Sequence, residues 1–87
     1  MNKISIDDLE KILNNKDVII ELTGIINYNI EIKNLKIKKD IDNIIMFSKD
    51  VKILKVDRHQ IMRIECIDGE YFIYFDSMQK IKIKNRS

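Results

Sequence analysis

The residues of this chain that could do acid–base or nucleophilic chemistry are few. His59 is the only histidine, and in the stretch Asp57-Arg58-His59 the carboxylate of Asp57 could orient it as a general base. A solvated turn explains the same three residues, because they separate two apolar runs. Cys66 is the only cysteine, and its apolar neighbours predict a small buried hydrophobe rather than a nucleophile. We therefore expect no catalytic residue and no enzymatic activity.

Cofactor and metal sites lack the residue patterns that they need. Gly24 and Gly69 are the only glycines and stand far apart, so no glycine-rich phosphate loop exists. One histidine and one cysteine cannot complete a zinc site. The adjacent carboxylates of Asp7 and Asp8 are explained by a helix start, where acidic residues suit the helix dipole. We expect no bound cofactor and no metal.

Lysine-rich segments offer a different chemistry, the binding of phosphates. If the two segments occupied neighbouring strands, they would form one phosphate-binding surface, and Tyr28, Phe72 or Tyr74 would stack on bases. The alternative is a pair of solvated strand faces, on which lysines also protect a sheet edge against aggregation. The two basic groups are Lys33, Lys36, Lys38 and Lys39 in the first, and Lys80, Lys82, Lys84 and Arg86 in the second.

The segment from Gln60 to Asp76 predicts a β-hairpin. Asp68-Gly69 separates two runs rich in β-branched and aromatic residues, and this dipeptide suits a two-residue type I′ turn. That turn sets the cross-strand pairs Ile67–Glu70, Cys66–Tyr71, Glu65–Phe72, Ile64–Ile73, Arg63–Tyr74 and Met62–Phe75. One face of the hairpin is then almost wholly apolar: Met62, Ile64, Cys66, Tyr71, Ile73 and Phe75. A one-residue slip would mix the two faces, so the pattern supports this register.

The other face of the hairpin combines aromatic and charged side chains and is the candidate protein interface. Exposed aromatic residues ringed by charges suit such an interface. A face that packs beneath another layer of strands, as in a small barrel, is the alternative. The residues of this face are Arg63, Glu65, Ile67, Glu70, Phe72 and Tyr74.

A helix from Ser5 to Asn15 is predicted to cover the apolar hairpin face, because an isolated hairpin is marginal in water. Ser5 and Asp8 have the spacing of a capping box, which favours a helix start at this point. The apolar residues at helical spacing that would form the buried stripe are Ile6, Leu9, Ile12 and Leu13.

Further strands complete the predicted sheet. They are Val18–Thr23, Ile30–Lys38, Val51–Val56 and Met78–Lys84. Shifts in the alternation of apolar residues predict bulges near Gly24, Lys33 and Leu54. The segment from Asp40 to Asp50 fits either a helical turn or a short strand, and its short apolar run favours a strand from Asn43 to Ser48. The fold class is thus α+β, an N-terminal helix packed on a curved antiparallel sheet of five to six strands.

The length and composition predict one domain over residues 1–87. Sixteen lysines and arginines nearly balance fourteen carboxylates, for a net charge of +2. The sequence contains no run of about 18 uncharged apolar residues, so no membrane span is expected. The N-terminus lacks the apolar core of a secretory signal. A lone cysteine fits a reducing cytoplasm, that of a bacterium or of a phage-infected host cell.

Both ends of the chain resemble a known family. The stretches Ile6–Leu9, Asn15–Asp17 and Leu22–Gly24, and near the end Met78-Gln79 with Ile81, Ile83 and Lys84, resemble small prophage-encoded anti-CRISPR proteins that inhibit Cas9. Those inhibitors are acidic and imitate DNA, whereas the middle of this chain is basic and predicted to form strands. The resemblance therefore implies a small phage-type inhibitor and assigns no binding residue. One helix before about five bent strands is also similar to Sm-like small barrels, which bind RNA.

Taken with the absence of visible catalytic chemistry, these features predict a non-enzymatic protein that occupies a macromolecular partner. A protein partner is favoured over nucleic acid, because carboxylates nearly balance cations and the composition is rich in Ile, Lys and Asn throughout. A host defence nuclease is the target that the resemblance implies. RNA or DNA held by the lysine-lined strand faces is the alternative, and self-association stays open.

Overall fold

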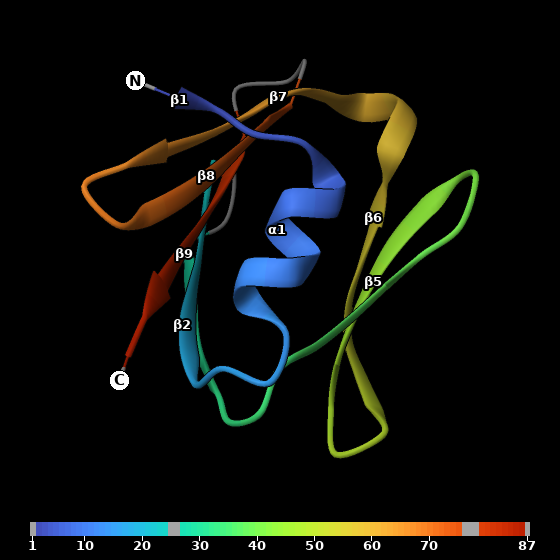
Figure 1. The fold of residues 1–87 in the computed structure, drawn as a ribbon, viewed down its shortest axis with the longest axis vertical. Helices are drawn as coiled ribbons and strands as arrows, with labels where there is room; N and C mark the ends of the chain where they lie inside the picture. Colours follow the sequence, from blue (N-terminus) through green and yellow to red (C-terminus); the bar gives the residue numbers. More distant parts are fainter. Residues whose placement is uncertain (1, 25–26, 76–78, 87) are drawn as a thin grey trace.

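The structure, a computed structural model, describes residues 2–24, 27–75 and 79–86. Along this part of the chain one α-helix, one short 3-10 helix and nine strands follow one another (Figure 1). Their bounds are β1 Asn2–Lys3, α1 Ile6–Leu13, β2 Val18–Thr23, β3 Tyr28–Ile32, β4 Lys36–Lys39, β5 Asn43–Ser48, β6 Val51–Asp57, η1 Arg58–Gln60, β7 Ile61–Ile67, β8 Glu70–Phe75 and β9 Lys80–Asn85. The predicted α+β class with an N-terminal helix is confirmed.

The strands divide over two antiparallel sheets rather than one. A six-stranded sheet has the order β1-β7-β8-β9-β2-β3, and a three-stranded sheet has the order β4-β5-β6. The chain passes between the sheets at two corners, from β3 to β4 and from β6 through η1 to β7. Figure 1 shows α1 in front of the space between the two sheets. Strands that switch sheets at bends are how two crossing sheets enclose a common core.

The corner between β3 and β4 overturns one strand prediction. A single bulged strand from Ile30 to Lys38 was expected, but the chain forms two strands that belong to different sheets. Asn34 lies between them with φ +55, in the left-handed region that asparagine tolerates better than most residues. Its N–H donates to Asp17 Oδ1 at 2.9 Å, which holds this corner against the segment between α1 and β2.

The β5–β6 ladder contains the bulge that was expected near Leu54. Met46 faces Leu54 and Phe47 faces Lys52, so Ile53 is the extra residue. The preference for a strand rather than a helical turn over β5 is confirmed as well. The shift in apolar alternation therefore located this bulge correctly. On its two sides, Leu54 pairs with buried Met46 and Lys52 pairs with Phe47 on the outer side of the sheet.

The hairpin of β7 and β8 has the predicted register in the five pairs nearest the turn. Asp68 has φ +51 and Gly69 has φ +79, as a type I′ turn requires of both central residues. The sixth pair is wrong, because Ile61 rather than Met62 faces Phe75. Met62 is the extra residue of a second bulge and is 55% exposed instead of lying on the apolar face.

Helix α1 begins at the predicted capping box. Ser5 Oγ accepts the N–H of Asp8 at 3.1 Å, and the Asp8 carboxylate accepts the N–H of Ser5 at 3.4 Å. Leu9 and Leu13 are buried, whereas Ile12 is 39% exposed and lies outside the buried stripe. The helix was predicted to cover the apolar hairpin face, but its main element contact is with β4 of the three-stranded sheet, and Leu9 and Leu13 join the core from that side.

One hydrophobic cluster joins the helix and both sheets. At its centre Ile73 of β8 faces Ile64 of β7 and Ile81 of β9, and all three side chains are buried. The buried members are Leu9, Leu13, Val18, Ile20, Ile32, Leu35, Ile37, Ile44, Met46, Val56, Ile64, Ile73, Ile81 and Ile83.

The two ends of the described chain pair with neighbouring strands. In β9 the predicted alternation is confirmed, with Ile81 and Ile83 buried and the lysines on the other face. The predicted start of this strand, Met78, lies outside the described residues. The two-residue strand β1 was not expected, and it covers part of the edge of β7, where Lys3 faces Glu65.

The bulge predicted near Gly24 is not found in β2, because its ladders with β3 and β9 contain no register shift.

Replacing Gly24, which follows β2, by alanine is expected to destabilise the fold by about 2 kcal/mol. Its φ of +147 is a conformation that L side chains rarely adopt, and an added Cβ would lie 2.6 Å from Gln79 Cγ and 3.2 Å from Gln79 Cα. Gly69→Ala is the matched control, because its φ of +79 is strained but no atom lies within 4 Å of the added Cβ. Urea denaturation should show a loss for Gly69→Ala of only about 1 kcal/mol, and equal losses would contradict the close approach.

Candidate functional site

The outer face of β8 presents two aromatic rings, and the strands on both sides hold cations against them. The half-buried rings of Phe72 and Tyr74 stack with centroids 6.1 Å apart. Lys80 Nζ and Lys82 Nζ lie 5.8 and 5.7 Å from the Phe72 centroid. The guanidinium carbon of Arg63 lies 4.1 Å from the Tyr74 centroid, within the range of a cation–π contact.

These residues and Glu65 form one surface, which we call the aromatic face: Arg63, Glu65, Phe72, Tyr74, Lys80 and Lys82. The structure thereby brings together two predicted groups, the outer hairpin face and the second basic group. Glu65, Phe72 and Lys82 lie side by side in one row across β7, β8 and β9. Ile67 and Glu70 continue the same face toward the hairpin turn.

Ion pairs neutralise much of the positive charge around the aromatic face. Lys82 Nζ lies 2.9 Å from Glu70 Oε2 and 3.6 Å from Glu21 Oε2. The hydrogen bond to Glu70 favours the charged amine and raises the pKa of Lys82. Lys84 Nζ lies 3.5 Å from the same Glu21 carboxylate. Two of the three lysines of this strand are therefore already matched to carboxylates of the same surface.

Glu65 is a buried carboxylate on a surface that the sequence predicted to be outward-facing. Only 4% of the residue is exposed, and it lies between Lys3 of β1 and Phe72 of β8. Arg63 Nε lies 3.4 Å from Glu65 Oε2, and Oε1 is buried without a hydrogen-bond donor among the described residues. A buried carboxylate oxygen without a donor costs free energy of folding. The position of Glu65 is therefore not explained by stability.

We expect Glu65→Met to raise the free energy of unfolding by about 1 kcal/mol, because an apolar side chain of similar length removes a buried carboxylate with an unpaired oxygen. The remaining charge of Arg63 is not buried, since its side chain is 38% exposed and lies over the Tyr74 ring. Glu70→Met is the matched control on the same face. Its carboxylate is more exposed and holds the 2.9 Å contact with Lys82, so no gain is expected there. Chemical denaturation measures both changes. A clear loss of stability in Glu65→Met would show that the buried pair with Arg63 stabilises the fold.

Cys66 lies on the inner side of the hairpin opposite Tyr71 and is half-buried rather than fully buried. Burial raises the pKa of the Tyr71 hydroxyl, and the neighbouring Cys66 thiol adds to the shift. Tyr71 therefore stays neutral at physiological pH. This pair belongs to the margin of the core and presents no reactive group to the aromatic face.

Three residues of the first basic group, Lys36, Lys38 and Lys39, lie on β4 in the other sheet. β4 pairs with β5, whereas the three lysines of the second group lie on β9 between β8 and β2. The condition under which the two groups would form one phosphate-binding surface is therefore not met. Lys39 is held by the helix, through an ion pair with Asp7 and a 3.7 Å contact with Glu10. Lys36 Nζ donates to Asn15 Oδ1, and Lys33 follows the end of β3.

The outer side of the three-stranded sheet carries lysines around an aromatic ring. Lys38 Nζ lies 5.5 Å from the Phe47 centroid, and Lys36 and Lys52 face Phe47 from the two neighbouring strands. We call this surface the basic face: Lys36, Lys38, Ile45, Phe47, Lys52 and Lys55. Sequence reasoning missed Lys52, Lys55 and Phe47 here. The alternation along β5 and β6 was the available signal, since the bulge at Ile53 puts Lys52 and Lys55 on the same side as Phe47.

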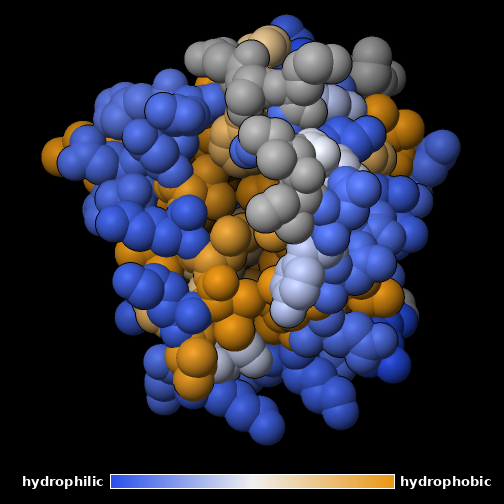
Figure 2. Space-filling view, turned by 180° about the vertical axis from the view of Figure 1, so that it is seen from behind, coloured by the Kyte–Doolittle hydropathy of each residue, from blue (hydrophilic) through white to orange (hydrophobic). Residues whose placement is uncertain are grey.

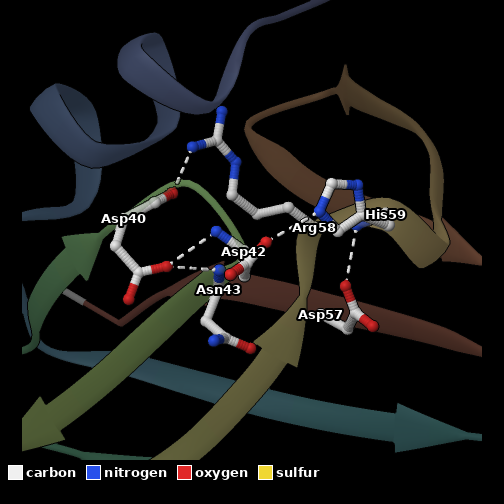
Figure 3. Close-up of polar contacts among 6 residues, drawn as sticks. All are labelled: Asp40, Asp42, Asn43, Asp57, Arg58 and His59. Atoms are coloured by element: carbon white, nitrogen blue, oxygen red, sulfur yellow. Dashed lines mark hydrogen bonds and ion pairs between the residues drawn. The ribbon is translucent and has the colours of Figure 1, made fainter.

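His59 lies at the corner between β6 and β7, beside the turn from β4 to β5 (Figure 3). Its Nε2 lies 3.1 Å from Asp42 Oδ1, so the ring contacts Asp42 and not the predicted Asp57. Asp57 Oδ1 instead accepts the backbone N–H of His59 at 2.9 Å, as the cap of η1. Arg58 donates to the backbone oxygen of Asp40. These contacts fasten two turns together and give the imidazole an exposed, structural position.

Asp40 is expected to make the stability of this corner depend on pH at the acid end. Its carboxylate accepts N–H bonds from Asn43 at 2.7 Å and Asp42 at 2.8 Å, and these hold its pKa below the ordinary value of 3.8. A lowered pKa in the folded state stabilises the fold above pH 3.8, and this contribution is lost as pH falls through the folded-state pKa. The native chain should therefore be more stable than Asp40→Asn at neutral pH. The difference in their free energies of unfolding should shrink as pH falls from about 5 to about 2. A constant difference would contradict this role.

A groove opens between the two sheets, lined by residues of β2, β6, β8 and β9. Its floor is apolar and its volume is about 450 Å³. Figure 2, which views the molecule from behind relative to Figure 1, shows hydrophobic surface running down the middle between hydrophilic margins. The apolar lining residues are Leu22, Leu54, Val56, Phe75 and Ile81. Four consecutive residues of β6, from Leu54 to Asp57, form one wall of the groove.

The described residues contain no cluster of side chains that could hold a metal ion. Within the same ranges, no helix has the length and apolar character needed to cross a bilayer. No family model, curated protein or solved structure matches the chain.

Proposed function

We propose that this chain is a non-enzymatic binding protein that occupies a protein partner through the aromatic face. The observation that carries this proposal is the stacked pair Phe72 and Tyr74, framed by charges of both signs on the outer side of a sheet. Aromatic anchors surrounded by charged residues are the side chains that dominate protein interfaces. A rigid strand presents them with little loss of conformational entropy on binding.

The charge pattern of the aromatic face supports a protein partner over nucleic acid. Lys82, Lys84 and Arg63 each lie within ion-pair distance of a carboxylate on the same surface. Phosphate binding gains its free energy by replacing counterions with unpaired lysine or arginine charges. Paired cations release fewer counterions, and the carboxylates repel a phosphate backbone. Charges of both signs instead favour a partner whose own surface is mixed.

Glu65 adds a second argument for binding at this surface. Its buried Oε1 lacks a donor among the described residues, next to the half-buried rings of Phe72 and Tyr74. A residue that lowers stability where it lies is often kept for a function. In a complex, a small rearrangement of Arg63 would let a donor of the partner reach this carboxylate. The resemblance at the chain ends leads us to propose a phage-type inhibitor, with a host defence nuclease as its target.

Affinity capture from a bacterial lysate, with and without nuclease, tests the proposal. We expect the native chain to retain a protein after nuclease treatment, and Phe72→Ala to lose it. Phe47→Ala is the matched control, because Phe47 is also half-buried and also has a lysine over its ring, but on the other sheet. Equal capture by Phe72→Ala and the native chain would contradict the proposal.

Single-stranded nucleic acid on the basic face is the second candidate. Lys36, Lys38 and Lys52 surround Phe47, and a ring among lysines suits a stacked base beside phosphates. Such binding would weaken steeply with salt, by a slope of about one per phosphate contacted. Recovery of nucleic acid alone in the capture, lost in Lys36→Glu/Lys52→Glu and kept in Phe72→Ala, would establish this candidate in place of the first.

A further inference from the structure

The edge of β6 differs from the other sheet edges near it. The edge of β4 is covered by residues after the helix, since Asn14 Oδ1 accepts the N–H of Ile37 and the backbone of Leu35 bonds to that of Asn15 and Lys16. The edge of β7 is covered in part by β1. In contrast, β6 ends the three-stranded sheet, and the described residues place no hydrogen-bonding partner along its second edge.

The direction of the β6 backbone groups follows from two hydrogen bonds at its end. Arg58 N–H donates to Asp42 O at 2.8 Å, and Asp40 N–H donates to Asn43 O at 2.9 Å. In an antiparallel ladder, successive residues direct their N–H and C=O groups to opposite edges. The backbone N–H and C=O groups that point toward β5 are therefore those of Leu54, Val56 and Arg58. The backbone groups of the alternate residues, Lys55 and Asp57, point to the uncovered edge.

The groove lies directly beside this edge. Its wall includes Lys55 and Asp57, the residues whose backbone groups are available, and its floor is formed by side chains of both sheets. A strand added to β6 would direct every second side chain toward the core side, where Leu54 and Val56 lie. The floor formed by Leu22, Phe75 and Ile81 would receive those side chains, so they must be apolar.

The other side of an added strand would meet lysines. Lys52 and Lys55 are exposed and lie on the outer side of β6, where their cross-strand partners are Phe47 and Ile45. Opposite charges on directly paired residues stabilise a sheet, and like charges destabilise it. Acidic side chains on the outer positions of the added strand would therefore complement the two lysines.

We propose that the uncovered edge of β6 and the groove beside it bind an extended segment of a partner protein in which apolar and acidic residues alternate. The main-chain bonds would come from Lys55 and Asp57, as in other complexes that add a strand to a sheet. Apolar side chains in the groove and carboxylates on Lys52 and Lys55 would select the sequence. This inference is independent of the aromatic face, which lies on the outer side of the other sheet.

A capped peptide of alternating glutamate and valine, equal to β6 in length, is the probe that tests this site, with an alternating lysine and valine peptide as its control. Titration into ¹⁵N-labelled protein should shift the amide signals of Lys55, Asp57 and Ile81 with the glutamate peptide only. In Lys52→Glu/Lys55→Glu the glutamate peptide should bind at least tenfold more weakly, and the lysine peptide should now bind. Lys36→Glu/Lys38→Glu, on β4 of the same sheet, should leave the affinity of the glutamate peptide within about threefold, because the edge of β4 is covered.

Several results would overturn the proposal. They are an absence of shifts at millimolar peptide, equal binding of both peptides, and shifts confined to Phe72 and Tyr74. Sedimentation of the protein alone identifies a second copy as the occupant, if a dimer forms at the concentration used and Lys55→Pro abolishes it. A dT oligonucleotide that shifts the β6 signals when the glutamate peptide does not would assign the edge to nucleic acid. If Lys52 and Lys55 only protect the edge against aggregation, neither the native chain nor Lys52→Glu/Lys55→Glu would bind either peptide.

Discussion

Replacing Ile73 by alanine is expected to lower the free energy of unfolding by about 2–5 kcal/mol. Ile73 is fully buried, faces Ile64 on β7 and Ile81 on β9, and so lies where three strands meet the core. Truncation removes buried apolar surface and leaves a cavity that two β-branched neighbours fill poorly. A domain of this size has a total stability of about 5–15 kcal/mol, so the loss is a large fraction of it.

Urea denaturation followed by circular dichroism measures this loss, and Ile41→Ala is its control. Ile41 has the same side chain but is 84% exposed, in the turn between β4 and β5. Its truncation should change the free energy of unfolding by less than about 0.5 kcal/mol. If Ile73→Ala left the urea midpoint near that of the native chain, the register and the core built on it would be wrong.

Phe72→Ala is expected to weaken binding of the captured protein partner by about 2 kcal/mol or more, which is roughly a 30-fold rise in Kd. The ring is held between Tyr74 and two lysine amines, so it is ordered before binding and loses little freedom in the complex. Truncation removes this anchor and releases the lysines from the ring. Isothermal titration with nuclease-treated partner measures the change.

Tyr28→Ala is the control that shows whether the loss of affinity is specific to Phe72 or follows from truncating any exposed aromatic residue. Tyr28 is 56% exposed on β3, the end strand of the same sheet, and lies two strands from β9. Its truncation should change Kd by less than about threefold, because isolated exposed aromatic residues outside an interface core contribute little. Near-native amide spectra of both variants are needed, so that a loss of binding is not a loss of fold.

Local chemistry explains why the hairpin was predictable and its far end was not. Asp68-Gly69 fixes a type I′ turn, and residues near the turn follow its register. Met62 lies beside η1, where the chain turns from one sheet to the other, and this corner inserts the extra residue. The corner at Asn34 likewise depends on Asp17, seventeen residues away, so apolar alternation alone read it as a bulge.

The candidate site was predictable in its parts but not in its assembly. Alternation placed Phe72 and Tyr74 on the outer hairpin face and the lysines on one side of the last strand. Their union required the pairing of β8 with β9, which puts Lys82 beside Phe72. The burial of Glu65 depends on β1, a strand too short to give a periodic signal, and on the placement of Arg63.

An NMR titration of labelled protein with the unlabelled partner captured after nuclease treatment decides between the aromatic face and the basic face as the interface. We expect the ring signals of Phe72 and Tyr74 and the amide signal of Lys82 to shift or broaden first. The ring signals of Phe47, on the other sheet, should stay unchanged. Perturbation centred on Phe47 and the lysines around it, with Phe72 and Tyr74 unaffected, would contradict binding through the aromatic face and would place the interface on the basic face.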